Sequence, residues 1–338
     1  MSNNKTRESN FELLRFLAMY FIVFYHLLLF FVVKVDDNVL YKAMYLPLHV
    51  AVLCFVLISG YFHIKPSFRG LAKLMTPLLI FYLPLTACGY FIFDMGRVED
   101  FFFFSKSPYW FIRTYLYLFL FAPVLNAFLI STKRRLYLLF TLGFIAVYMG
   151  TMHEGALSNG KNLVLFMLLY VIGDLLHIYK EKLSNIKMLP LIVFYIVFNI
   201  CLVALYSCTP GSIYGKALWR LSYPYCSPIL LVNALLFFLI FSKIKLKSTV
   251  VNYLSGSVFT IYVLHHHPLV LEKVLSPMVM GAYAQFSYSS ILVLSLLACI
   301  TFVVMFASIG IDKLFSPFIS YVVDFASKID EKAHFKLQ

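Results

Sequence analysis

The chain has 338 residues, of which 62% are hydrophobic and 13% are charged, and its mean hydropathy is +0.87. Soluble domains are about half apolar and about a quarter charged, so this composition excludes a soluble protein and predicts an integral membrane protein. The net charge of +13 comes from short basic clusters between apolar runs. Because no continuous basic face is formed, we expect no nucleic-acid partner.

The apolar runs have the length of membrane-spanning helices, roughly 17–25 residues. In chain order they are Phe11–Val33, Met44–Phe62, Leu71–Phe93, Tyr109–Ile130, Leu136–Met152, Leu163–Ile178, Leu189–Ser207, Tyr225–Phe241, Val250–Leu271 and Ser287–Ile311. We therefore predict an all-α, polytopic transmembrane bundle of about ten helices. Residues 1–338 are expected to form one integral membrane domain, with a short cytoplasmic tail at 312–338. The first run is too long for a signal peptide and should remain as helix one.

The basic residues alternate between connections in a way that predicts orientation. With the amino terminus inside, each inner connection is basic, whereas the outer loops carry acidic residues. The inner connections hold Lys65, Arg69, Lys73, Lys133, Arg134, Arg135, Lys180, Lys182, Lys187, Lys243, Lys245 and Lys247. By the positive-inside rule, both termini are cytoplasmic, and we expect a multi-pass protein of the inner, or plasma, membrane.

Helix one contains two basic residues, Arg15 and His26. They lie just over three turns apart, so they project from one face at a separation of about 16 Å along the axis. Glu12 is placed for an ion pair with Arg15. Charged groups at membrane depth are usually functional, although Arg15 could snorkel to the headgroups and His26 could make an interhelical hydrogen bond. A cation near the inner mouth can hold a phosphate, and a deeper neutral imidazole can accept a proton.

A second group of candidate site residues lies at the start of the fourth predicted helix. Tyr109 and Trp110 are typical either of an interfacial aromatic belt or of rings that stack on a sugar. Arg113, one turn further along, either snorkels to the surface or recognises a carboxylate.

Other polar residues have simpler interpretations. Asp174, near the inner end of the sixth helix, is expected to pair with a basic residue. We expect interhelical hydrogen bonds from three asparagines, Asn126, Asn199 and Asn233. We expect three residues to be solvated at the outer surface, namely His49, His153 and Glu154.

Three consecutive histidines, His265, His266 and His267, suggest a metal site at first sight. Consecutive helical residues point about 100° apart, so these rings cannot converge on one ion, and the six scattered cysteines form no CxxC pair. We expect no metal. His267 precedes Pro268 and predicts a break in the helix. His265 could face a sugar or bond to a carbonyl group.

Five stretches carry a family resemblance, in the same order along the chain. They are NFELLRFLAMYFIVFYH (Asn10–His26), LISGYF (Leu57–Phe62), PYWFIRTYLYLFLFAPVLN (Pro108–Asn126), FMLLYVIGDLL (Phe166–Leu176) and LSGSVFTIYVLHHHPLV (Leu254–Val270). Together they resemble the membrane acyltransferase-3 family, the O-acyltransferases of lipopolysaccharide, capsule and peptidoglycan. The family usually has a basic pair after SGY, and here Arg69 and Lys73 stand one turn apart.

The resemblance implies a membrane O-acyltransferase. Its donor would be a cytoplasmic acyl-CoA, most often acetyl-CoA, used as a co-substrate with no permanently bound cofactor. Its acceptor would be a hydroxyl of an extracytoplasmic or lipid-linked saccharide, such as exopolysaccharide, capsule or O-antigen. The implied roles are His26 as general base or acyl acceptor; Arg15, Arg69 and Lys73 as a CoA clamp; and Tyr109, Trp110, Arg113 and His265 as contacts of the sugar.

Two other functions remain open at this level. A transporter or flippase of a lipid-linked saccharide or anion could use Arg15 and Arg113 as ligands, although paired broken helices in two matching halves are absent. A polysaccharide polymerase could have a similar number of helices, but we find no large extracytoplasmic loop.

Overall fold

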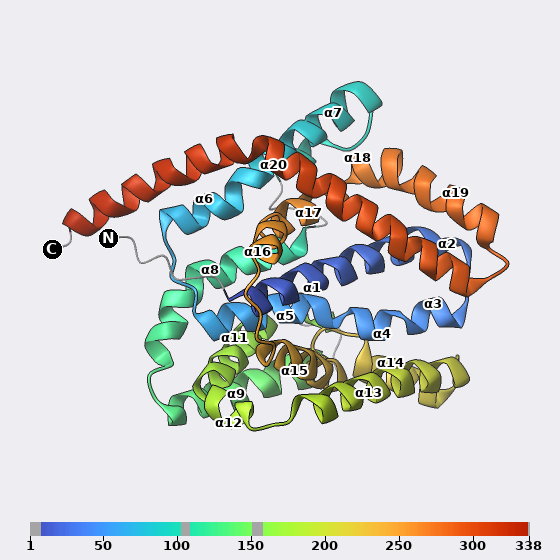
Figure 1. Cartoon of the computed structure of the whole chain (residues 1–338), viewed down its shortest axis with the longest axis horizontal. Helices are drawn as coiled ribbons and strands as arrows, with labels where there is room; N and C mark the ends of the chain where they lie inside the picture. The colour runs from blue at the N-terminus through green and yellow to red at the C-terminus, as the bar shows by residue number, and fades with distance from the viewer. Residues whose placement is uncertain (1–7, 103–108, 151–157, 337–338) are drawn as a thin grey trace. The chain divides into compact units, whose positions relative to one another are not determined.

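The computed structural model describes residues 8–102, 109–150 and 158–336, and every regular element within these ranges is a helix (Figure 1). The chain forms two compact units, each built from two separated stretches. The first comprises Met1–Ile64 and Val124–Ser255, and the second comprises Lys65–Pro123 and Gly256–Gln338. The predicted single membrane domain would include both units.

The first unit begins with helix one and its π-helical continuation. Its elements are α1 (Ser9–Leu27), η1 (Leu28–Val32), α2 (Val33–Val35), α3 (Val39–Ala43), α4 (Tyr45–Leu48), α5 (Val50–Phe62), α9 (Thr132–Gly143), η4 (Phe144–Met149), η5 (Ser158–Gly160), α11 (Leu163–Ile178), α12 (Lys180–Ser184), α13 (Met188–Cys208), α14 (Ile213–Ser222), α15 (Pro228–Ser242) and α16 (Thr249–Ser255).

The second unit contains the longest helix. Its elements are α6 (Phe68–Pro77), η2 (Leu78–Tyr82), α7 (Leu83–Phe93), η3 (Val98–Phe101), α17 (Val258–His265), α18 (Pro268–Val270), η6 (Leu271–Leu275), α19 (Ser276–Phe286) and α20 (Ser290–Lys336). Helix α8 (Trp110–Phe128) belongs to this unit up to Pro123 and to the first unit beyond it.

Within the described ranges, six helical stretches are long and apolar enough to cross a membrane. They are Ser9–Val35, Val39–Phe62, Phe68–Phe93, Trp110–Phe128, Met188–Cys208 and Ser290–Lys332. Helices α11 and α15 are apolar but shorter. These eight stretches match eight of the predicted runs. The run predicted at Leu136–Met152 corresponds to α9 and η4, and it extends past Gly150 beyond the described residues.

The prediction of an unbroken helix from Val250 to His266 is wrong, whereas the break predicted at His267 is present. The structure divides it into α16, α17 and α18, with breaks at Gly256–Ser257 and His266–His267. At the first break, the hydroxyls of Ser257 and Thr260 donate to the carboxylate of Asp312 on α20. At the second, Pro268 has no N–H to continue the helix, as its position after His267 predicts. The predicted tail at 312–338 continues α20 as a helix as far as Lys336.

Helices α5 and α11 pack closely in the first unit because glycines lie at their contact. A Cβ atom on Gly60 would lie 2.2 Å from the carbonyl oxygen of Tyr170, and one on Gly173 would lie 2.4 Å from that of Leu57. Small residues permit such backbone approach between helices in a membrane.

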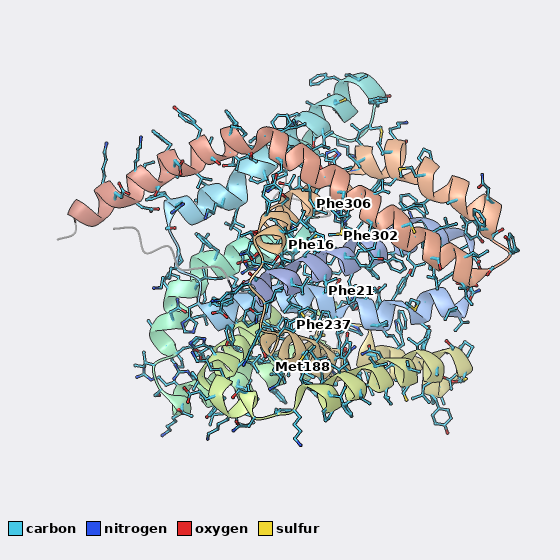
Figure 2. All side chains as sticks on the ribbon, in the orientation of Figure 1. Phe16, Phe21, Met188, Phe237, Phe302 and Phe306 are labelled. Carbon is cyan, nitrogen blue, oxygen red and sulfur yellow. The ribbon has the colours of Figure 1, made fainter. Side chains whose placement is uncertain are left out.

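Aromatic and amide contacts complete the first unit. Phe21 of α1 and Phe237 of α15 stack with ring centroids 5.6 Å apart, and Figure 2 labels both. The amides of Asn199 and Asn233 bond each other across α13 and α15 at 3.0 and 2.8 Å. This exchange confirms the interhelical bonds predicted for these two residues.

Candidate active site

The face of α1 that carries Arg15 and His26 is covered by protein. Met19 and Ile22 lie between them, one and two turns after Arg15, and are 3% and 7% exposed. Arg15 and His26 themselves are half-buried. This face therefore does not point freely into lipid, and the two ionisable side chains are joined by buried surface of the same helix.

The predicted ion pair at the start of this face is present. Arg15 Nη1 lies 2.5 Å from Glu12 Oε1, and Ser255 at the end of α16 donates its hydroxyl to Glu12 Oε2 at 2.6 Å. Glu12 is only 6% exposed. A buried carboxylate with two partners has a defined position. Glu12 therefore orients the guanidinium group of Arg15.

His26 lies at the end of α1, where the helix widens into the π-helical turn η1. Phe30 belongs to that turn and stacks on the His26 ring, with centroids 5.2 Å apart and planes inclined by 21°. Tyr25 contacts the same ring at 5.5 Å. Such π-helical turns occur frequently at functional sites. A half-buried imidazole held in this way can serve as a general base.

A buried aromatic cluster adjoins His26 through Tyr25. The hydroxyls of Tyr25 and Tyr223 are 2.9 Å apart, and the ring of Tyr25 contacts His49 at 4.5 Å. His49 is 4% exposed and its Nδ1 bonds the carbonyl of Tyr223 at 2.9 Å. The predicted solvated position of His49 is therefore wrong, because Tyr223 and Tyr225, which follow α14, stack on the ring. Its buried Nε2 has no hydrogen-bond partner within the described residues. His153 and Glu154 lie outside the described residues.

A polar network is centred on Asp174 of α11, whose side chain is 1% exposed. Arg135 Nε donates to Asp174 Oδ2 and His63 Nε2 bonds Asp174 Oδ1, both at 2.7 Å. The predicted basic partner of Asp174 is thus Arg135. His63 directly follows α5 and has a positive φ of 58°, a backbone conformation that is strained for a side-chain-bearing residue.

Next to this network, Asn126 makes its predicted interhelical bond. The hydroxyl of Tyr170 donates to Asn126 Oδ1 at 2.7 Å, and Asn126 Nδ2 donates to the carbonyl of Ile64 at 2.9 Å. These bonds join α8, α11 and the end of α5 in the first unit.

We expect Arg135→Ala to destabilise the protein by about 3 kcal/mol, because it removes the guanidinium group from a fully buried carboxylate. The adjacent Arg134 is exposed and lies over the ring of Phe128. Arg134→Ala should therefore change stability by less than about 1 kcal/mol. Thermal unfolding of the two purified variants measures the difference, and equal effects would contradict the structural role given to Arg135.

In the second unit, Tyr109 and His265 are both buried. The side chain of each one forms a hydrogen bond with a backbone carbonyl group of α17, the helix that His265 ends. Tyr109 is 2% exposed and its hydroxyl donates to the carbonyl of Val263 at 2.7 Å. His265 is 0% exposed and its Nδ1 bonds the carbonyl of Ile261 at 2.6 Å. Of the two alternatives given for His265, contact with a sugar or a hydrogen bond to a carbonyl group, the structure thus shows the second. Trp110 and Arg113, on α8 directly after Tyr109, are half-buried.

His267 has a local structural role. Its Nδ1 accepts the N–H of Leu269 at 3.2 Å and so caps α18, while its Nε2 lies 3.2 Å from the hydroxyl of Thr86.

Arg69 and Lys73 are exposed on one face of α6 in the second unit, as their spacing predicts. The amino end of α6 already has an anionic partner. The backbone N–H groups of Phe68 and Arg69 donate to the carboxylate of Asp330 on α20 at 2.8 and 2.9 Å. A carboxylate of this chain therefore already occupies the terminus of α6.

The sequence model of the acyltransferase-3 family, described as an acyltransferase domain, matches residues 8–312. The chain belongs to the acyltransferase-3 family. The protein is therefore an acyltransferase, and with its apolar helices it is a membrane acyltransferase. No curated protein and no solved structure matches the chain. The family match includes all the predicted site residues and ends at Asp312, so the last part of α20 lies outside it.

Sequence reasoning missed several residues that shape the sites of this acyltransferase. Ser255 and His63 gave no signal, because their partners Glu12 and Asp174 are distant in the chain. His49 did give one, since a histidine within an apolar run is costly in a membrane unless it is bonded.

Proposed function

We propose that this acyltransferase transfers an acyl group, acetyl in the first instance, from cytoplasmic acyl-CoA to a hydroxyl of an extracytoplasmic or lipid-linked saccharide. The proposal includes about ten membrane spans, both termini in the cytoplasm and a location in the inner, or plasma, membrane. The alternation of basic connections supports this orientation.

The observation that carries the proposal is the buried face of α1. It has an oriented cation at one end, a half-buried imidazole near the other, and the buried Met19 and Ile22 between them. A phosphate group of CoA at Arg15 would make a charge-assisted bond. The roughly 16 Å to His26 can be bridged by an extended pantetheine arm that ends in the thioester.

In the proposed reaction, the imidazole of His26 accepts the proton of the acceptor hydroxyl. The oxygen then attacks the thioester carbonyl, the C–O bond of the ester forms, and the C–S bond breaks. The CoA thiolate leaves and takes the proton from the imidazolium of His26, which returns His26 to its neutral form. We prefer this general-base role to an acyl-histidine intermediate, because it needs no second covalent step.

The remaining assignments rest on the family resemblance. The roles of Arg69 and Lys73 at the CoA phosphates stay predictions. Trp110 and Arg113, both half-buried, are the proposed contacts of the saccharide. For Tyr109 and His265, whose polar atoms bond carbonyl groups of α17, we propose a supporting role in which they hold that helix.

Transfer of radioactive acetyl from acetyl-CoA tests the proposal. Membranes containing the protein should move the label onto glycan, and mass spectrometry should show the loss of an acyl mass from the glycans of a deletion strain. If glycan from the deletion strain keeps every acyl group and the membranes transfer no label, the proposal fails. A change in saccharide export without any change in acylation would favour the transporter.

A further inference from the structure

A cavity of about 630 Å³ lies in the first unit, lined by α12, the start of α13 and the end of α15. Four lysines line it, Lys180, Lys187, Lys243 and Lys245, and the residues that line it include no aspartate or glutamate. The lysines come from two connections that are far apart in the chain. The fold thus gathers four positive charges around one space, with no carboxylate among the residues that line it.

One of the lysines is fixed in place. The ammonium group of Lys243, which is half-buried, donates to the carbonyl of Leu183. The other three are exposed at residue level and so can move towards a ligand. Like charges that converge on one cavity repel each other unless an anion offsets them. Convergence of this kind is therefore typical of an anion site.

The amino end of α13 adds to the positive potential. The helix is 21 residues long and starts at Met188, next to Lys187 at its N-cap, and no side chain caps its first turn. Both residues line the cavity, and Figure 2 labels Met188. An uncapped helix start presents N–H groups, here those of Met188 and Leu189 because Pro190 has none, together with the positive end of the helix dipole. Phosphate groups commonly bind at such a helix start.

Besides the lysines, the cavity wall has three polar residues, Ser184, Asn185 and Ser242, and an apolar part. The apolar part includes Tyr61, Leu176, Phe238 and Ile244. Beyond the cavity, α13 exposes apolar residues along its length, among them Leu189 at 71%, Val193 at 52% and Phe194 at 54%. A ligand that has both an anionic head and an apolar tail would match the cationic cavity and the adjoining apolar helix.

We propose that this cavity binds a phosphate-bearing headgroup, with an anionic membrane lipid as the ligand class. Clusters of basic residues at the cytoplasmic ends of membrane helices bind anionic lipid headgroups through the same chemistry. A soluble phosphate compound could occupy the same cationic groups, and the experiment separates the two sources. The site is distinct from the face of α1 that carries Arg15 and His26, and it does not depend on the proposed acyl transfer.

The chain provides a matched control. Lys182 and Lys247 belong to the same two connections as Lys187 and Lys245 but do not line the cavity. The test therefore compares K187Q/K245Q with K182Q/K247Q, which remove the same charge from the same segments. Purified full-length protein is titrated with phosphatidylglycerol, and bound lipid is counted by native mass spectrometry. Phosphatidylcholine serves as the lipid with no net charge, and inorganic pyrophosphate as the soluble phosphate.

We expect phosphatidylglycerol to bind more tightly than phosphatidylcholine. A basic residue near an anionic lipid contributes about fivefold in affinity, so K187Q/K245Q should bind phosphatidylglycerol roughly 30-fold more weakly. K182Q/K247Q should stay within about twofold of the unchanged protein. Displacement of the lipid by pyrophosphate would assign the site to phosphate in general, and lack of displacement would assign it to the lipid.

The proposal is overturned if both double variants lose lipid equally, if K187Q/K245Q binds like the unchanged protein, or if phosphatidylcholine binds as tightly as phosphatidylglycerol. Unfolding temperatures of the lipid-free variants show whether each one is folded. If K187Q/K245Q does not fold, K245Q and K247Q alone provide the same comparison, because Lys245 is outside every helix.

Discussion

Replacing His26 with alanine is expected to abolish most acyl transfer while the protein still folds. A positioned general base accelerates proton transfer by roughly 10²–10⁴-fold, so kcat should fall by about that factor. Half-burial of the ring and its stacking on Phe30 suggest only a modest loss of packing. The measurement is the rate of label transfer from acetyl-CoA to glycan, at equal amounts of folded protein.

Two further variants sharpen this prediction. Arg15→Ala should act mainly on KM for acyl-CoA, because a cation that holds the CoA phosphates contributes to binding of the donor. His177→Ala replaces another half-buried histidine of the first unit, at the end of α11, whose ring contacts Tyr61 and His63, and it should retain activity. Full activity of His26→Ala would end the assignment of this residue. Label that accumulates on the protein in the absence of acceptor would instead indicate an acyl-enzyme.

Alanine at Gly60 or Gly173 is expected to prevent α5 and α11 from packing. The added Cβ would lie 2.2 Å or 2.4 Å from a backbone carbonyl oxygen, and backbone cannot move aside as a flexible side chain can. The helices would have to separate, at an expected cost of about 3 kcal/mol or more in the free energy of unfolding. Because His63 and Asp174 adjoin this contact, their hydrogen bond should also be lost.

Gly310 of α20 is the matched control. It too is a helical glycine, but a Cβ atom there would meet nothing within 4 Å. Alanine is the better helix former, so Gly310→Ala should be neutral or stabilising by about 0.5–1 kcal/mol. Thermal unfolding and the yield of monodisperse protein compare the three variants. Similar behaviour of Gly60→Ala and Gly310→Ala would show that the close approach of α5 and α11 is not needed for folding.

The family and much of the helical layout could be predicted from sequence because their signals are local. An apolar run long enough to cross a membrane is recognisable by itself, and most of the predicted runs appear as helices within a few residues. The pair of Glu12 and Arg15 was predictable for the same reason, since it depends only on the helical repeat. The partner that buries His49 was not predictable, because Tyr223, whose carbonyl it bonds, lies in another part of the chain.

The sequence by itself determined the membrane class, the acyltransferase-3 resemblance and the shared face of Arg15 and His26, since each follows from composition, motif order or helical spacing. Tertiary structure decided which polar groups meet. Asp312 of α20 accepts hydrogen bonds from Ser257, at the break before α17, and from Thr260 within α17. Asp174 takes its partners from α9 and from the residue after α5. The reason is physical: a buried polar group must find a hydrogen-bond partner wherever the packing supplies one, and the packing joins segments that no local pattern links.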